Sequence, residues 1–155
     1  ISERNCLNLK KKNLIILRIS NVIGGIIKKK RKINNNFYEN YLKFCKLKKK
    51  IKYENHYKDF ISSKQLSEYI YSILFLNLSG IFNLSIGKKI YVKELVSWLN
   101  TYNEKKFLFE EVKLKTNNSF YLNNLKILKK INKKIKKKDL RQYCINLSKE
   151  IFKKK

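Results

Sequence analysis

Apolar residues follow different periods in different parts of this 155-residue chain, and each period predicts a different element. Residues 13–22, NLIILRISNV, form a nearly continuous apolar run, which is typical of a strand buried on both faces of a parallel sheet. Residues 80–85, GIFNLS, form a second strand of this kind. Residues 51–61 alternate in character, which predicts an extended segment. Two further short strands are expected at residues 89–91 and 107–115.

Apolar residues spaced three and four apart predict helices between these strands. The helices are expected at residues 34–48, 63–76, 92–102, 122–131 and 139–152. Residues 1–10 are expected to hold the end of a further helix. Ser62 or Ser63 can cap the helix over 63–76, whose buried stripe is expected to end at Leu74. Trp98 is expected in the core, and Asp139 as the N-cap of the last helix. Because strands alternate with helices and no repeat divides the chain, the pattern predicts a single α/β unit.

Two segments need a separate interpretation. Residues 69–87 carry no charge over about the length of a membrane span, but polar residues and the turn signal Ser79-Gly80 interrupt them. We interpret them as the end of a helix, a turn and a strand, and we expect no membrane contact. Residues 133–138, KKIKKK, are interpreted as a solvated linker.

The chain is strongly basic, with 38 Lys and Arg against 11 Asp and Glu and a net charge of +27. Such a charge attracts polyanions, and Tyr and Phe alternate with Lys in residues 37–57. A basic nucleic-acid-binding module is therefore an alternative function. Against it, the lysines are spread through every segment, and no RRM, KH or helix-turn-helix signature is present. The lack of Ala, Pro and Met beside abundant Lys, Asn and Ile is also the pattern of AT-rich codon usage.

The cysteines and the histidine carry little chemistry in this sequence. Cys6, Cys45 and Cys144 are odd in number and form no CxxC, so neither a disulfide framework nor a metal site is indicated. We expect reduced cysteines in a cytoplasmic protein. His56 is the single histidine and is interpreted as a surface residue. The chain begins Ile-Ser-Glu without a leader pattern and lacks Met, so we interpret it as a fragment of a longer protein.

Two polar residues interrupt the apolar run over 13–22. A buried guanidinium or amide is costly unless it is paired, so Arg18 is expected to pair with a nearby carboxylate or with carbonyls. Asn21 ends the run, and ligands of doubly wound sheets bind beyond the carboxyl ends of the strands. Asn21 therefore either meets a substrate or caps its own turn. Gly24-Gly25 is expected to turn the chain away from this point.

Four segments, in one order, resemble motifs of the extended short-chain dehydrogenases/reductases, the sugar-nucleotide epimerase/dehydratase family. LRISNVIGG (17–25) is similar to LRxxNVYGP, and YKDFISSKQLSEYI (57–70) is similar to RDFIxVxDLAxAI. GIFNLSIGKKIYVKELVSWL (80–99) resembles GxFNVGSGxxxSxxELAxxI, and SFYLNNLKILKKI (119–131) resembles yxxDxSKxxxxLG. The resemblance implies the C-terminal portion of a Rossmann-like doubly wound sheet plus a small α/β substrate-binding subdomain.

The resemblance also implies an organisation and a function. Residues 1–25 would end the Rossmann part, and residues 26–155 would form mostly the substrate-binding part of an NAD- or NADP-dependent enzyme acting on a nucleotide-sugar. The glycine-rich dinucleotide turn and the YxxxK motif are expected on a missing N-terminal half, with the catalytic Lys two residues before Ile1 if Glu3 matches the family's acidic residue. The chain alone is then expected to be inactive, and the full-length protein to form a homodimer.

The same resemblance implies a substrate site without catalytic residues. Asn21 matches an Asn that contacts the nucleotide-sugar, and Lys58 stands where the family has an Arg that binds the diphosphate. Lys113 or Lys115 lies near a second phosphate-binding Arg of the family. These side chains are expected to converge on one cleft that faces the absent cofactor half.

Three neighbouring residues have structural expectations. In the family pattern, Asp59 would hold a turn and Phe60 would lie in the core. Lys64-Gln65 replaces an Asp pair of the family, which is a departure at the start of a helix.

Overall fold

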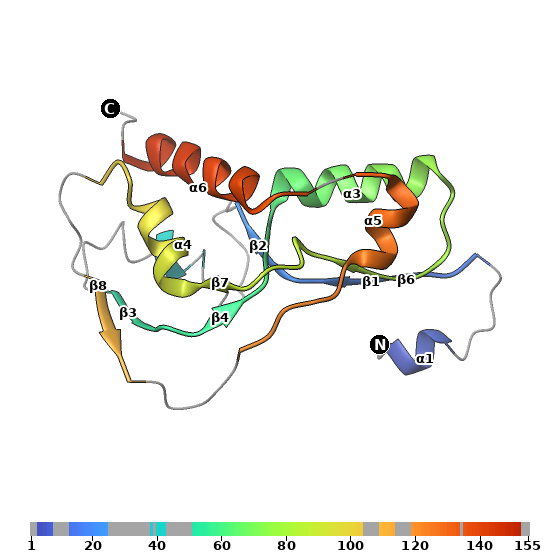
Figure 1. The fold of residues 1–155 in the computed structure, drawn as a ribbon, viewed down its shortest axis with the longest axis horizontal. Coiled ribbons are helices and arrows are strands. Elements are labelled where there is room, and N and C mark those ends of the chain that lie inside the picture. The colour runs from blue at the N-terminus through green and yellow to red at the C-terminus, as the bar shows by residue number, and fades with distance from the viewer. Residues whose placement is uncertain are drawn as a thin grey trace, which may run out of the picture.

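The computed structural model describes residues 3–7, 13–24, 38, 40–42, 51–103, 109–113, 119–133 and 135–152. Its elements are labelled in Figure 1. In chain order they are α1 (Glu3–Leu7), β1 (Ile15–Ile19), β2 (Asn21–Ile23), β3 (Ile51–Glu54), β4 (Tyr57–Lys58), β5 (Phe60–Ser62), α3 (Ser63–Phe75), β6 (Gly80–Leu84), β7 (Ile90–Tyr91), α4 (Val92–Leu99), β8 (Phe109–Val112), α5 (Leu125–Ile131) and α6 (Lys137–Phe152).

The two apolar runs form a parallel pair, as the sequence predicts. β1 pairs with β6 over five positions, from Ile15 opposite Gly80 to Ile19 opposite Leu84. A second parallel pair joins β2 to β5, and a third joins β3 to β8. β4 and β7 are antiparallel, with Lys58 opposite Ile90. The predicted α/β class is therefore confirmed.

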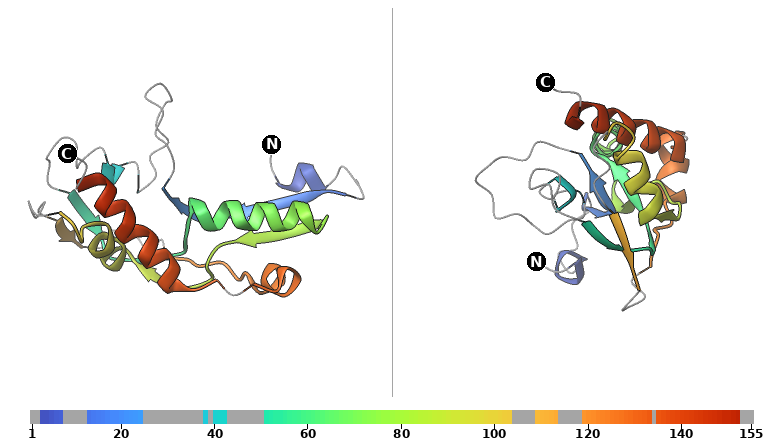
Figure 2. Two further views of the ribbon diagram at one scale, coloured as in Figure 1. Left: turned by 90° about the horizontal axis from the view of Figure 1, so that it is seen from above. Right: turned by 90° about the vertical axis from the view of Figure 1, so that its left-hand side faces the viewer.

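The run over 13–22 is not one strand buried on both faces. It divides at Ser20 into β1 and β2, and Ile19 at the end of β1 is 46% exposed. In the part of the chain that the structure describes, β1 has β6 as its single strand partner, and α3 lies along one side of this pair (Figure 2). The periodicity predicts an apolar strand correctly, but it does not reveal how many neighbours cover it.

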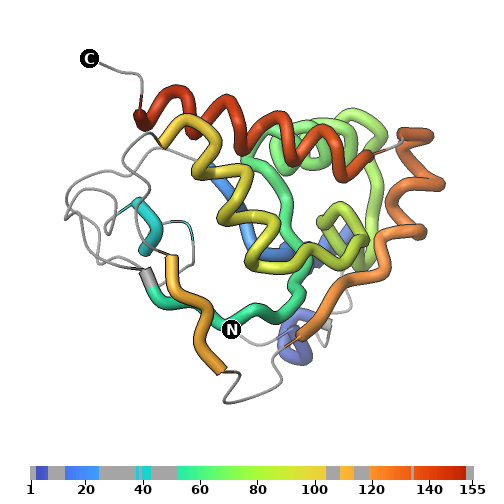
Figure 3. Tube along the Cα trace, turned by 60° about the vertical axis from the view of Figure 1, so that its left-hand side comes forward, coloured from blue at the N-terminus to red at the C-terminus, as the bar shows by residue number. Residues whose placement is uncertain are grey.

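The described core has two clusters. One lies between α3, α5 and the β1–β6 pair, where Tyr69 and Ile73 of α3 contact Phe82 and Leu84 of β6. The other lies between α4, α6 and β7, where Trp98 packs with Leu140. Figure 3 shows α4 lying beside α6. The core position predicted for Trp98 is confirmed, since this side chain is 8% exposed.

Most of the predicted helices are present, but their first or last residues differ from those predicted. Ser62 caps α3 and shares a reciprocal capping box with Gln65, so one of the two predicted caps is selected. Leu74 is 66% exposed, and its predicted burial is wrong because the buried stripe of α3 ends at Ile73. α4 ends at Leu99 rather than at residue 102.

The last two helices begin at different residues from those predicted. α5 begins at Leu125 rather than at residue 122. α6 begins at Lys137, so Asp139 is not its N-cap but lies within its first turn. The Asp139 carboxylate accepts a hydrogen bond from the amide of Lys136 at 3.3 Å. Of the helix predicted over 34–48, most residues lie outside the described ranges, but Tyr41 is helical and fully buried.

Residues 69–87 have the predicted organisation: α3 ends at Phe75, a turn follows, and β6 begins at Gly80. Among the described helices, none combines the length and the hydropathy that a membrane span requires.

The connection between α5 and α6 is not simply a solvated linker. Lys133 pairs with Glu68 on α3. Lys137, at the start of α6, pairs with Glu94 on α4 at 2.8 Å. The two lysines therefore attach this connection to two helices, whereas Lys136 and Lys138 are exposed and fit the solvated interpretation.

Candidate functional site

The chain changes its strand partner between Ser20 and Asn21. The Ser20 amide donates to Leu84 O at 3.1 Å and so continues the β1–β6 pairing. The Asn21 amide donates instead to Asp59 O at 3.3 Å and begins the β2–β5 pairing. Two parallel strands, β6 and β5, therefore separate at this point. The junction lies at the carboxyl ends of β1 and β6 and at the amino ends of β2 and β5. Ligands of α/β sheets bind beyond the carboxyl ends of strands, where the strand order changes.

Asp59 occupies this junction and is fully buried. Its Oδ2 accepts hydrogen bonds from the amides of Gly87 and Leu122, both at 3.1 Å. Burial raises the pKa of the Asp59 carboxyl, and hydrogen bonds, with Leu122 contributing most, oppose this shift. Asp59 thus joins β5 to the loop after β6 and to the segment before α5. We predicted that Asp59 holds a turn, whereas its hydrogen bonds reach two segments distant in the sequence. The predicted core position of Phe60 is confirmed.

A second buried network fixes the loop after β6. The Tyr69 hydroxyl donates to Ser85 O at 2.9 Å, and Asn124 Nδ2 donates to the same carbonyl at 2.8 Å. Burial raises the pKa of Tyr69 to about 12, so the hydroxyl keeps its proton. Gly87 has φ +65°, and a Cβ there would lie 2.8 Å from Cγ of Asn124. The loop geometry therefore requires a glycine at this position.

The side chain of Asn21 is half-buried and points toward β5. Its Nδ2 donates to Asp59 O at 3.0 Å, so this amide bonds to the neighbouring strand rather than to its own turn. The bond orients the side chain at the junction, where Ser20 is also buried at 7% exposure. The Ser20 hydroxyl lacks a hydrogen-bond partner among the described residues.

Lys58 directly precedes Asp59, so the structure places it within one residue of the carbonyl that binds Asn21. Lys58 is half-buried and has no ion pair within the described ranges.

The pKa of His56 is lowered, first by burial and second by the positive charge of the nearby Lys58. His56 is half-buried rather than an exposed surface residue, which corrects the sequence interpretation.

Lys113 follows the end of β8 and is exposed. The register of β8 with β3 ends at Val112 opposite Glu54, so Lys113 lies one position beyond this pair. Lys115 lies outside the described residues. The Asn21 side chain therefore bonds to the backbone of the residue after Lys58, but no described contact joins the side chains of Asn21, Lys58 and Lys113 to one another.

Sequence reasoning missed the cationic and aromatic cluster beside β4. Lys89 Nζ lies 4.8 Å from the ring centre of Tyr57 and 5.7 Å from that of Tyr121. The Tyr57 and Tyr91 rings meet edge to face at 6.0 Å. The alternation of Lys and Tyr around residues 53–58 is the signal that could have indicated it. Lys89, which precedes β7, therefore places a further positive charge beside β4, the strand that carries Lys58.

Arg18 is satisfied structurally, as predicted. Its guanidinium donates to both carboxylate oxygens of Glu3, from Nε at 2.9 Å and from Nη2 at 2.5 Å. The ion pair lowers the pKa of Glu3 and raises that of Arg18. It attaches α1 to β1 and leaves Ser20 and Asn21 as the polar residues of this run at the junction.

Two further features of the chain concern catalysis and metal binding. The spacing YxxxK does occur, at Tyr102 and Lys106, although we expected none. It follows α4, whereas the family's motif precedes the segment that resembles LRISNVIGG, so it does not stand in the catalytic position. In the described part of the chain, no group of His, Cys, Asp and Glu could hold a metal ion.

Comparison with known proteins shows a clear structural likeness. No family model matches the sequence, and no curated protein matches it. The fold is similar to that of an ADP-L-glycero-D-manno-heptose-6-epimerase from Helicobacter pylori, with a TM-score of 0.74, 17% identity, and coverage of 96% of this chain and 48% of that chain. The fold is also similar to that of a UDP-N-acetylglucosamine 4-epimerase from Methanobrevibacter ruminantium M1 in complex with UDP-N-acetylmuramic acid. The TM-score is 0.71 at 14% identity, over 91% of this chain and 46% of that chain.

A dTDP-glucose 4,6-dehydratase from Bacillus anthracis str. Ames, in complex with NAD, gives a TM-score of 0.66 at 16% identity over 90% of this chain and 44% of that chain. These epimerases and dehydratases belong to the extended short-chain dehydrogenases/reductases. The chain therefore has a Rossmann-like α/β fold of this family, and the resemblance seen in its motifs is confirmed at the level of the fold. It spans about half the length of the solved structures that it matches.

Proposed function

We propose that this chain is the substrate-binding portion of an NAD- or NADP-dependent nucleotide-sugar epimerase or dehydratase, or of a related oxidoreductase. The observation that carries the proposal is the change of strand partner at Ser20 and Asn21, which opens a junction at the carboxyl ends of the parallel strands β1 and β6. The similar solved structures include epimerases and a dehydratase that act on nucleotide-sugars by name. A cytoplasmic location belongs to the same proposal.

The proposed site binds and orients its substrate through Asn21 and Lys58, with Lys113 and Lys115 as further phosphate-binding candidates. Asn21 is held by Asp59 O through its Nδ2, and its amide oxygen is proposed to accept a hydrogen bond from the substrate. Lysine supplies charge to a diphosphate but lacks the two-pronged geometry of arginine. Lys58 therefore contributes attraction rather than a fixed orientation. The orientation is then set by Asn21.

The residues present do not form a dinucleotide site. The four glycines are Gly24, Gly25, Gly80 and Gly87, and their spacing does not give a glycine-rich phosphate-binding turn. We propose that the cofactor binds to a separate half of the fold, to which residues 1–25 belong and against which residues 26–155 present the substrate. Hydride chemistry would be supplied there. The full-length enzyme is proposed to be a homodimer and the chain alone to be inactive.

Titration of UDP-glucose into the chain, followed by calorimetry at physiological salt, tests this proposal. We expect saturable binding that Lys58→Ala weakens several-fold. Lys129→Ala is the matched control, because Lys129 is an exposed lysine of α5 far along the chain from the junction. Equal losses in the two variants would show generic attraction to a basic protein and would contradict the proposed site.

The alternative function, nucleic-acid binding, makes a different prediction for the same calorimetric titration. Scattered lysines bind phosphates without reading bases, so affinity for an oligonucleotide should fall steeply with salt and show little sequence preference. A clear sequence preference at physiological salt would favour the alternative.

A further inference from the structure

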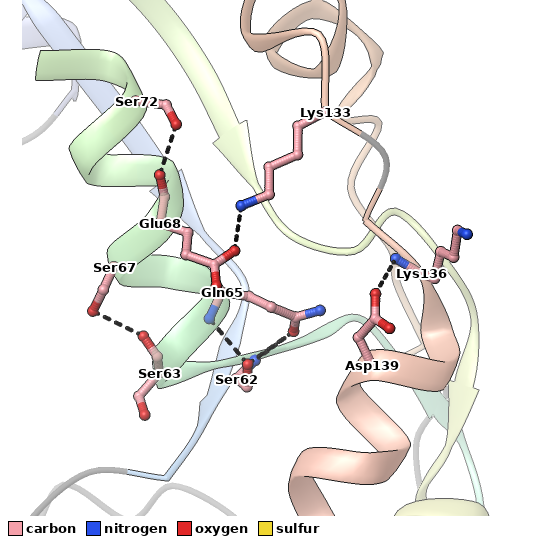
Figure 4. Close-up of polar contacts among 9 residues, drawn as sticks. All are labelled: Ser62, Ser63, Gln65, Ser67, Glu68, Ser72, Lys133, Lys136 and Asp139. Atoms are coloured by element: carbon pink, nitrogen blue, oxygen red, sulfur yellow. Dashed lines mark hydrogen bonds and ion pairs between the residues drawn. The ribbon is translucent and has the colours of Figure 1, made fainter. Parts of the chain in front are cut away.

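A cleft lies between the first turns of α3 and α6, on the α-helical side of the molecule. It has a volume of about 350 Å³, within the range of about 300–1,000 Å³ typical of small-molecule sites. Ser62, which caps α3, lines one wall together with Gln65 and Glu68 of α3, and the other wall comes from α6 (Figure 4). Lys133 and Ile135, from the α5–α6 connection, line the cleft as well.

Gln65 is the polar group that this cleft leaves unsatisfied. The residue is 6% exposed. Its Oε1 accepts from the Ser62 amide at 3.1 Å and from the Ser62 hydroxyl at 2.9 Å. A backbone amide can only donate, so the side-chain oxygen must face Ser62 and the NH₂ group must face away from it. This Nε2 has no hydrogen-bond partner among the described residues, and Figure 4 shows it directed toward the space beside Asp139.

The charges around the cleft are balanced. Lys64 and Lys133 line it, and so do Glu68 and Asp139. Glu68 is paired with Lys133, and Asp139 accepts the Lys136 amide. An anion would meet two carboxylates here, and a metal ion would meet an NH₂ group and two ammonium groups. Neither kind of ligand is favoured by this lining.

The remaining wall of the cleft can both donate and accept hydrogen bonds. Gln142 and Asn146 are exposed amides of α6, one turn apart and joined at 3.1 Å. The Tyr143 hydroxyl lies 2.7 Å from Ser63 Oγ, and the residue lines the cleft. Hydroxyl groups are the ligands that match such a surface, because each donates one hydrogen bond and accepts two.

We propose that the cleft between α3 and α6 binds an uncharged, hydroxyl-rich ligand of monosaccharide size, one of whose oxygens accepts a hydrogen bond from Gln65 Nε2. The site is separate from the junction at Asn21 and does not depend on the function proposed for that junction. The neighbouring carboxylates accept hydrogen bonds from other hydroxyls of the same ligand. A buried donor without an acceptor destabilises the fold, so a ligand that supplies the missing acceptor gains affinity.

The proposal is tested by NMR titration of the ¹⁵N-labelled chain with D-glucose. We expect saturable shifts of the Gln65 side-chain NH₂ signals and of amide signals from the first turns of α3 and α6. Gln65→Glu keeps an oxygen for the Ser62 cap but removes the NH₂ donor, and should weaken binding at least tenfold. Asn77→Asp, which adds the same charge at the opposite, exposed end of α3, should leave binding unchanged.

Inorganic phosphate and UDP-glucose complete the experiment. Phosphate should give no saturable shift of the Gln65 signals. The affinity of UDP-glucose, read from the same signals, should be no higher than that of glucose. Saturation by phosphate alone would identify an anion site and overturn the proposal. Absence of a saturable response to glucose would show that the cleft holds water only and would also overturn it. Equal affinity in the wild-type chain and in Gln65→Glu, with both shown to be folded by thermal melting, would exclude the assigned donor.

Discussion

Gly24 lies directly against the ring of Tyr143, which joins the end of β2 to the first half of α6. Gly24 has φ +94°, and a Cβ there would lie 2.9 Å from two ring carbons of Tyr143 and closer still to its hydroxyl. The same hydroxyl bonds Ser63 at the start of α3. The turn after β2, α3 and α6 therefore meet at one small contact that only glycine permits.

Gly24→Ala should destabilise the chain more than Gly80→Ala. Both positions have positive φ, at which alanine costs about 1–3 kcal/mol in strain. A Cβ at Gly80 would meet only the end of Lys126 at 3.7 Å, whereas at Gly24 it would displace Tyr143. Urea unfolding of both variants separates strain from collision. Equal losses would show that Tyr143 moves aside freely.

Replacement of Asp59 should show the value of its two acceptor bonds. Asp59→Leu leaves the Leu122 amide without its acceptor, at about 1–3 kcal/mol, whereas the Gly87 amide keeps a second acceptor in Ser85 Oγ at 3.1 Å. Asp59→Asn keeps one acceptor oxygen and should lose less. Chemical unfolding at pH 7 measures both variants. Similar losses would mean that packing, rather than hydrogen bonding, is what Asp59 provides.

Asp59 should also contribute a pH dependence. Its pKa is raised in the folded chain above its ordinary value of 3.8, so the folded state binds the proton more tightly than the unfolded state. The contribution of Asp59 to the free energy of unfolding should therefore increase as the pH falls through its folded pKa toward 3.8, and Asp59→Asn should lack this increase. The opposite slope difference, in unfolding measured from pH 6 to 4, would contradict the raised pKa.

His56 should act in the opposite sense at higher pH. Its pKa is lowered from its ordinary value of 6.5 by burial and by Lys58, so protonation favours the unfolded state. The stability associated with neutral His56 is complete above about pH 6.5 and is lost as the pH falls through the folded pKa. His56→Gln should flatten the unfolding free energy between pH 7.5 and 5. A variant with the wild-type slope would show that His56 is not its origin.

In a full-length enzyme that contains this chain, Asn21→Ala and Lys58→Ala should each reduce transition-state stabilisation by about 1–3 kcal/mol, the scale of a hydrogen bond to a charged group. The comparison of kcat/KM with that of the wild type measures the loss. Lys129→Ala serves again as the control. Wild-type kcat/KM in both site variants would remove Asn21 and Lys58 from the substrate site.

Local periodicity accounts for much of the fold. The apolar runs at 13–22 and 80–85 predict β1 and β6, and the Ser62 cap together with the apolar stripe predicts α3. The division at Ser20 is not predictable in this way, because it depends on which strands lie beside the run. The hydrogen bond from the Leu122 amide to Asp59 joins residues 63 positions apart, and no sequence pattern in either segment predicts it. In the candidate site, the motifs indicate Asn21 and Lys58, whereas the buried donor of Gln65 becomes visible only with its surroundings.

The two ion pairs of the α5–α6 connection have a consequence for how this sequence can change. Glu68 and Glu94 each select one lysine from a run that offers several alternatives within a few residues. With 38 cations and 11 anions in the chain, carboxylates are the scarce partners. Replacement of Lys133 or Lys137 leaves neighbours that can take over the pairing, whereas replacement of Glu68 or Glu94 leaves a cluster of like charges without a counter-ion. Substitutions should therefore accumulate freely among the lysines of this connection and be restricted at the two glutamates that hold it.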